Sequence, residues 1–311
     1  MDDTPKPRFR TDNNSSQTFI LPDGRSLGYA QYGALTGKPI LYQHGHPASR
    51  LEAAGFDDLG LELGARIIAM DRPGFGWSSP HPGRKLLDHP KDIEHLANHL
   101  GLDHYSVLGI SGGGPYALAC AAALPAEKLR CVSIVCGMGP PDIGMKGADF
   151  IHKLGFAGGY RYTPMSILRW FAKWFWSRDL AGRLDLSDEK RLELLLQQPI
   201  AHEKDADFLK TDWPRLYLRS TRESFAQGFD AIAEDGKVMC MDLGFKIEDI
   251  RPDLPVQLWY GKFDTFVPPN HGVQIAARLG NRAHLKLEDE THGSIVVNCI
   301  REVFEDLLSS S

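Results

Sequence analysis

The chain has 311 residues, of which 42% are hydrophobic and 24% charged, a composition typical of a globular protein with room for one large domain. Its formal net charge is −5, so it lacks the positive field by which proteins bind nucleic acids or anionic membranes. Its five cysteines show no C-x-x-C spacing, which excludes the usual zinc and disulfide frameworks.

The N-terminal half of the chain alternates between apolar runs and helix-forming segments. Residues 1–16 are rich in Pro, Asp and Asn, and we expect a mobile tail there. A Pro-Asp-Gly turn at 22–24 then predicts a β-hairpin over 17–33. Further strands are expected at 39–43, 66–70, 105–110 and 131–136, and helices at 48–63, 88–100 and 117–123. Continuous apolar strands are buried on both faces, which predicts a parallel sheet covered by helices.

This alternation breaks after residue 140 and resumes near 241. Residues 141–240 read as irregular helices, whereas 256–260 and 283–287 are again apolar strands followed by helices. We therefore expect an α/β core made of 17–140 and 241–311, with 141–240 inserted as a helical cap, or lid. The cap is rich in aromatic residues, and we expect Trp170, Trp174 and Tyr160 to contact a substrate.

A serine stands between a buried strand and a helix in the stretch Gly109-Ile110-Ser111-Gly112-Gly113. The pattern G-x-S-x-G makes a tight turn that lifts the serine hydroxyl above the end of a sheet. The adjoining helix N-terminus offers free backbone N–H groups to a developing negative charge. The pattern is weak by itself, but in this strand–turn–helix context it predicts that Ser111 is a nucleophile.

A serine hydroxyl needs a base, most often a histidine that a carboxylate orients. Asp264 and His292 lie downstream, and each follows an expected strand, so both should reach the same edge of the sheet as Ser111. Asp142 is an alternative acid because it too follows a strand, and His271 is an alternative base near Asp264. We favour Asp264 because of its shorter turn and its position, and His292 because it follows a strand whereas His271 stands at an expected helix start.

The loop His44-Gly45-His46-Pro47 closes another strand at this edge. We expect the backbone N–H of His46 to pair with that of Gly112 as an oxyanion hole, since Pro47 has no N–H to offer. His44 is expected to be a structural histidine bonded to the backbone.

One pair of histidines has the spacing of metal ligands. His95 and His99 lie four residues apart on an expected helix, but the glutamate that a metalloprotease helix carries after its first histidine is missing. We therefore expect no metal and no organic cofactor.

Taken together, these motifs make the chain resemble the α/β-hydrolase fold superfamily, in its capped group known as AB hydrolase-1. The stretch 44–47 is similar to the HGxP loop of that group and 71–78 to its DRPGxGxS stretch; 109–113, 261–268 and 291–293 resemble the nucleophile, acid and histidine loops. The resemblance covers about 18–140 and 240–308. It implies an eight-stranded, mostly parallel sheet with a cap and a triad in the order Ser, Asp, His.

The serine narrows the chemistry that the resemblance implies. Epoxide hydrolases and haloalkane dehalogenases of the group have Asp where Ser111 stands, so these reactions are not expected. We expect hydrolysis of a small, largely apolar ester, thioester or lactone through an acyl-enzyme on Ser111. Hydrolysis of a carbon–carbon bond in a β-diketone and a non-catalytic small-molecule receptor stay open as alternatives.

The expected surroundings of the protein follow from the same observations. No apolar run is long enough to span a bilayer, and the first residues do not resemble a secretory signal, so we expect a cytoplasmic protein. Its partner is expected to be a small-molecule substrate, not nucleic acid or a membrane, with a homodimer left open.

Overall fold

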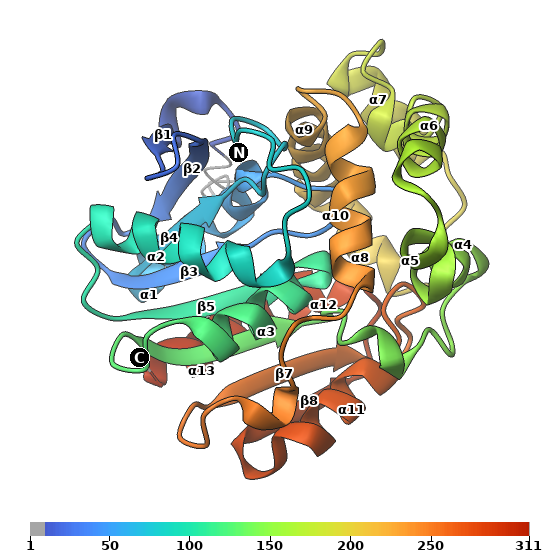
Figure 1. The fold of residues 1–311 in the computed structure, drawn as a ribbon. Coiled ribbons are helices and arrows are strands. Elements are labelled where there is room, and N and C mark those ends of the chain that lie inside the picture. Colours follow the sequence, from blue (N-terminus) through green and yellow to red (C-terminus); the bar gives the residue numbers. More distant parts are fainter. Residues whose placement is uncertain (1–9, 311) are drawn as a thin grey trace, which may run out of the picture.

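One eight-stranded sheet forms the centre of the computed structural model, which describes residues 10–310 (Figure 1). The strand order is β1-β2-β4-β3-β5-β6-β7-β8. β2 pairs antiparallel with β1 and β4, and every other neighbouring pair is parallel. The strands are β1 Ser16–Ile20, β2 Ser26–Gly33, β3 Lys38–Gln43, β4 Ala65–Met70, β5 Tyr105–Ile110, β6 Leu129–Val135, β7 Val256–Gly261 and β8 Ala283–Glu288. The predicted eight-stranded, mostly parallel sheet is confirmed.

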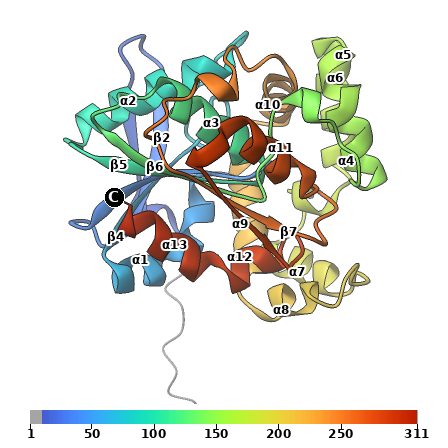
Figure 2. The same cartoon turned by 90° about the horizontal axis from the view of Figure 1, so that it is seen from below.

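Helices cover both faces of this sheet (Figure 2). One face carries α2 (His89–His99), α3 (Gly114–Ala123) and α11 (Asn270–Leu279), and the other carries α1 (Asp57–Leu63), α12 (Ser294–Asn298) and α13 (Ile300–Ser309). Val107 and Leu108, neighbours on β5, belong to the two separate hydrophobic clusters on opposite faces. Such strands read as unbroken apolar runs because both of their faces are buried.

Two expected helices differ from the observed ones. The segment expected as one helix over 48–63 begins as a 3-10 helix, Arg50–Phe56, before α1. Its first turn is held by Asp71, which accepts hydrogen bonds from both the backbone N–H and the guanidinium of Arg50. The expected C-terminal helix is divided at Cys299 into α12 and α13.

Part of the tail expected to be mobile is held against the core. Arg10 forms an ion pair with the buried carboxylate of Asp57, with 2.6 Å between Nε and Oδ2, and Asn13–Ser15 forms a 3-10 helix that leads into β1. The tail is held there because the buried carboxylate of Asp57 attracts the positive charge of Arg10. The rest of the expected tail lies outside the described residues.

The segment between β6 and β7 contains helices and no strand throughout 141–240. They are α4 Phe150–Leu154, α5 Tyr160–Tyr162, α6 Met165–Trp176, α7 Asp188–Leu196, α8 Asp205–Lys210, α9 Trp213–Ser224 and α10 Asp230–Cys240 (Figure 1). We refer to 141–240 as the cap. Across residues 10–310, no helix combines the length and apolar character needed to cross a bilayer.

Buried ion pairs tie the cap to the loops that follow β3 and β4. On α10, Asp235 pairs with Arg72, with Nη2 and Oδ2 2.9 Å apart, and on α9 Glu223 pairs with Arg50 at 2.8 Å. Arg72 and Arg50 have almost no exposed surface. Since a buried charge is costly without a partner, these pairs fix the cap above the carboxyl ends of the strands.

Candidate active site

Ser111 lies at the turn between β5 and α3, with a backbone φ of 54°. This left-handed conformation is unfavourable for residues other than glycine, and it is the strained geometry of a nucleophile at the apex of a strand-to-helix turn. Gly113 stands where a Cβ atom would come within 2.1 Å of the carbonyl oxygen of Gln43. The turn is therefore compatible only with glycine at that position.

The three residues expected as a triad come together at the carboxyl ends of their strands. Nε2 of His292 lies 2.9 Å from Oγ of Ser111, and its Nδ1 lies 2.7 Å from Oδ2 of Asp264. The other carboxylate oxygen of Asp264 accepts the backbone N–H groups of Phe266 and Val267 at 2.8 and 2.9 Å. An ionised Asp264 accepts the proton of Nδ1, which leaves Nε2 free to accept the serine hydroxyl.

Two opposing effects set the protonation of His292. Burial lowers the pKa of the imidazole, but the negative charge of Asp264 and its hydrogen bond, together with the neighbouring Cys136, raise it by more. The pKa of His292 therefore lies well above its ordinary value. An imidazolium formed at this position would be stabilised by the carboxylate of Asp264.

The loop after β3 lies against the nucleophile turn. A Cβ atom added to Gly112 would stand 2.6 Å from Cβ of His46 and 3.1 Å from its backbone nitrogen. Glu52 accepts the N–H of Gly45 at 2.7 Å, and the guanidinium of Arg72 donates to the carbonyl of Gly45 at 2.7 Å. The backbone of His46 is thus held beside Gly112 by a loop that Glu52 and Arg72 fix in place.

Cys136 is a neighbour of this site that the sequence reasoning left among the apolar residues. Its Sγ lies 3.9 Å from Nε2 of His292, and its backbone φ of 42° is left-handed. Burial raises the pKa of the thiol, which favours the neutral form. The position at the end of β6, one strand along from Ser111, is the signal that could have found it.

Cys136, Asp264 and His292 together place a thiol, a carboxylate and an imidazole nitrogen within 4.8 Å of one another. The carboxylate bonds to Nδ1 of the ring, however, whereas the thiol faces Nε2. One ion cannot use both partners through a single ring nitrogen, so the arrangement suits proton transfer better than metal ligation.

The rival residues lie elsewhere. Asp142 is exposed and pairs with Arg278, with 2.6 Å between Nη2 and Oδ2. Nδ1 of His271 accepts the backbone N–H of Gly139 at 3.0 Å, and burial lowers the pKa of this imidazole to about 4. His44 is buried with Nδ1 bonded to the carbonyl of Gly45, as expected of a structural histidine.

Glu290 lies two residues before His292 in the sequence. Its side chain is buried and accepts hydrogen bonds from Ser294 and Asn298. These donors compensate the carboxylate for the water it has lost.

Aromatic rings join the two sides of the site. The ring of Phe266 lies 5.1 Å from that of His292 and 4.5 Å from that of His152, on α4 of the cap. Phe156 lies 6.3 Å from His152 and 6.2 Å from His46. The rings form an apolar wall from the triad to the oxyanion loop, and most of them come from the cap.

The aromatic residues expected to bind substrate divide into two groups. Tyr160 joins the wall, with its ring centroid 6.3 Å from that of His46. Trp170 and Trp174 instead lie on the outer face of α6 and are 66% and 45% exposed. The expectation for these two tryptophans is corrected, because an amphipathic helix such as α6 turns only Leu168 and Ala172 fully inward.

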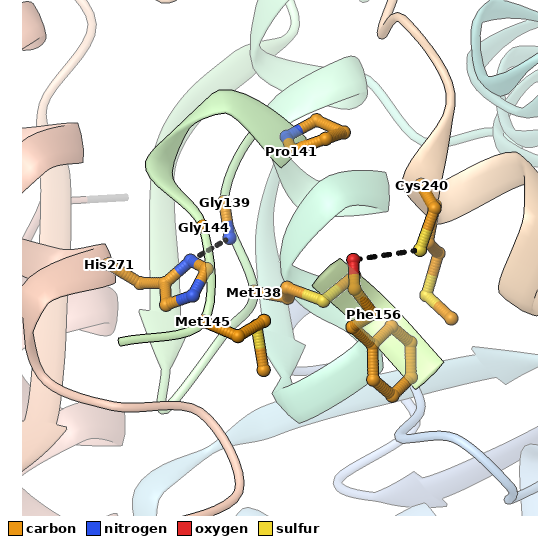
Figure 3. A pocket seen from close by; sticks show the side chains of 9 residues that line it. Met138, Gly139, Pro141, Gly144, Met145, Phe156, Cys240 and His271 are labelled. Atoms are coloured by element: carbon orange, nitrogen blue, oxygen red, sulfur yellow. Dashed lines mark hydrogen bonds between the residues drawn. The ribbon is translucent and has the colours of Figure 1, made fainter. Parts of the chain in front are cut away.

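A small cavity opens beside this wall (Figure 3). It lies between the loop after β6, helix α10 and helix α11, and Phe156 separates it from His46. The side chains around it include three methionines and one cysteine; its lining is Met138, Gly139, Pro141, Gly144, Met145, Phe156, Met239, Cys240 and His271.

The family model for the alpha/beta hydrolase fold matches residues 38–298, which is most of the chain. The chain belongs to the α/β-hydrolase fold family. The resemblance drawn from the loop motifs is thereby confirmed, as is the expectation of an enzyme of the hydrolase class.

Individual relatives of this α/β-hydrolase match shorter stretches. The chain is 35% identical over 115 residues to "Uncharacterized hydrolase YcgS" of Bacillus subtilis, an alignment covering 37% of this chain and 39% of that protein. It is 36% identical over 107 residues to a proline iminopeptidase of Xanthomonas citri, covering 33% of each. The matched stretch thus spans about two-fifths or less of these curated relatives.

A solved structure extends the likeness to the whole fold. An esterase from Exiguobacterium antarcticum superposes with a TM-score of 0.62 at 17% identity, covering 94% of this hydrolase and 99% of that chain. At this identity the likeness concerns the fold alone.

Proposed function

We propose that this hydrolase cleaves small, largely apolar carboxylic esters, thioesters or lactones through an acyl-enzyme on Ser111. The observation that carries the proposal is the chain of two hydrogen bonds from Asp264 through His292 to Ser111, at 2.7 and 2.9 Å. Nothing in the folding of a parallel sheet requires these residue types at the ends of three strands.

The first half of the reaction forms the acyl-enzyme. Nε2 of His292 takes the hydroxyl proton as Oγ of Ser111 attacks the carbonyl carbon, and Asp264 stabilises the resulting imidazolium. The backbone N–H groups of His46 and Gly112 bind the oxyanion of the tetrahedral intermediate. His292 then gives the proton to the leaving oxygen or sulfur, and the alcohol or thiol departs.

The second half repeats these steps with water. His292 takes a proton from water, the hydroxide attacks the acyl carbon, and the carboxylic acid leaves as Oγ regains its proton. The preference of the enzyme for apolar substrates is supported by the apolar wall that contains Phe266 and Phe156. Such a wall excludes water and favours hydrocarbon or aromatic groups.

A panel of p-nitrophenyl esters of increasing acyl length, assayed beside a β-diketone of matched size, tests the proposal. We expect turnover of the short esters by the native chain and none by Ser111→Ala. Turnover of the diketone with no turnover of any ester would replace ester hydrolysis by carbon–carbon bond hydrolysis. Tight binding of the esters without product would favour the receptor.

A further inference from the structure

His46 carries a ring nitrogen that the steps above do not use. Its side chain is only 4% exposed, yet Nε2 has no hydrogen-bond partner in the part of the chain that the structure describes. Buried polar atoms are nearly always paired, so an unpaired one beside an active site requires an explanation. The backbone of the same residue adjoins Gly112 and contributes to the expected oxyanion hole.

The partner of the other ring nitrogen determines which nitrogen of His46 is protonated. Nδ1 lies 2.9 Å from Oδ2 of Asp235, on cap helix α10. Oδ1 of that carboxylate also accepts the hydroxyl of Tyr116 at 2.6 Å, and it accepts Nη2 of Arg84 and Nε of Arg72, each at 3.1 Å. A carboxylate among these donors is ionised and can only accept. Nδ1 of His46 therefore carries a proton and donates it to Asp235.

The surroundings of the ring favour the neutral imidazole. Burial lowers the pKa of His46, whereas the hydrogen bond that it donates to Asp235 and the charge of that carboxylate raise it; the nearby charge of Arg72 lowers it further, and the pKa lies below its ordinary value. In a neutral imidazole whose Nδ1 is protonated, Nε2 is an acceptor with a free lone pair. The buried polar atom is therefore an acceptor that lacks a donor.

The surroundings of the His46 ring indicate where a donor to its Nε2 would lie. The imidazole stands between the nucleophile turn, which Gly112 brings close to its Cβ, and the cap. Phe156 and Tyr160 approach it edge-on, with ring planes inclined by 77° and 82°. These groups enclose the imidazole between the turn that carries Ser111 and the aromatic wall, and the acyl part of a substrate attached to Ser111 would lie beside this enclosure.

We propose that Nε2 of His46 accepts a hydrogen bond from a hydroxyl or N–H group on the acyl part of the substrate, so that the enzyme selects esters with such a donor. The proposal rests on the proposed ester hydrolysis. Because the same residue binds the oxyanion through its backbone, the donor must lie within a few bonds of the scissile carbonyl, as in an α-hydroxy ester. Asp235 is the positioning residue that holds the acceptor in this tautomer.

The test compares two p-nitrophenyl esters that differ only in an α-hydroxyl or an α-fluorine, since fluorine is similar in size but cannot donate. The measured quantity is the ratio of kcat/KM for the hydroxy ester over the fluoro ester, which cancels general damage to a variant. We expect this ratio to fall about tenfold or more in His46→Phe, which keeps a ring but lacks the acceptor. Tyr160→Phe, which removes the other polar group of the enclosure, should keep the native ratio.

A ratio unchanged in His46→Phe, or lost in Tyr160→Phe instead, would overturn the proposal. A second measurement does not depend on turnover: the ¹⁵N NMR signal of His46 Nε2 should be that of an unprotonated nitrogen near neutral pH and should shift when the hydroxy ester is added to Ser111→Ala. A protonated Nε2 in the free protein would contradict the tautomer. Failure of ester hydrolysis itself would show differently, as no turnover of either ester by the native chain, and the NMR result would still decide the role of His46.

Discussion

Oδ2 of Asp264 lies 2.7 Å from Nδ1 of His292, and Oδ1 accepts hydrogen bonds from two backbone N–H groups of the same loop. The carboxylate is thereby fixed in orientation beside a buried imidazole. This one relationship decides which ring nitrogen faces Ser111 and how strongly His292 holds a proton.

The first prediction concerns the pH profile of Asp264→Asn. Attack by Ser111 requires the unprotonated form of His292. Because the pKa of His292 is raised, kcat/KM of the native chain should rise with pH at a pH above the ordinary pKa of a histidine. Without the negative charge of Asp264, the largest effect that raises this pKa is lost while burial still lowers it, so the rise should move to lower pH while kcat falls by roughly 10⁴-fold. Initial rates on a short-chain ester across the pH range measure both effects. An acid limb at an unchanged pH would show that Asp264 does not set the pKa of His292.

Gly112→Ala tests the oxyanion hole. The added Cβ would meet Cβ of His46 at 2.6 Å and force the two loops apart. We expect kcat to fall by about 10²- to 10³-fold, the range for loss of an oxyanion donor. Gly101→Ala is the control for general destabilisation: an added Cβ meets nothing within 4 Å there, but the φ of 64° is unfavourable for alanine, and kcat should stay within about twofold. Equal activity in both variants would argue against the placement of the oxyanion hole.

A third prediction concerns the ion pairs under the cap. Arg50→Ala leaves the fully buried carboxylate of Asp71 without its cation and the nearly buried Glu223 with Arg219 alone. The free energy of unfolding should fall by about 3–5 kcal/mol in urea titrations. Arg301→Ala breaks an exposed pair with Glu62 and should leave the urea midpoint close to that of the native chain. Similar losses in the two variants would mean that the buried network does not hold the cap.

The aromatic wall can be separated from the outer surface of the cap by two matched truncations. Phe156→Ala removes a ring beside His46, and we expect kcat/KM for an apolar ester to fall about tenfold. Trp174→Ala removes a larger ring from the exposed face of α6 and should change kcat/KM by less than about twofold. A larger loss in Trp174→Ala than in Phe156→Ala would show that Trp174 contacts the substrate and Phe156 does not.

The sequence predicted those site residues whose placement depends on local structure and strand topology. Ser111, Asp264 and His292 each follow an apolar strand, and the ends of parallel strands meet at one edge whatever the rest of the chain does. The same reasoning predicted that the loop carrying His46 lies beside Gly112, and in the structure it does. These relationships require only that the sheet form in the expected order.

The cap could not be predicted in this way. Which face of a cap helix turns inward depends on how it docks on the core, and composition alone does not distinguish Trp170 on the surface from Tyr160 beside His46. Asp235 reads as an ordinary charge on an amphipathic helix until Arg72, more than 160 positions earlier, is seen to face it. Cys136 likewise looks like one more apolar residue of its strand.

The central claim is that His292 activates Ser111 as a nucleophile. Intact-mass measurement after treatment with a fluorophosphonate tests it most directly, because only an activated serine forms the covalent adduct. We predict a single adduct on the native chain, none on Ser111→Ala and none on His292→Ala within the same time. An adduct that persists in Ser111→Ala, or no adduct on the folded native chain, would contradict the account.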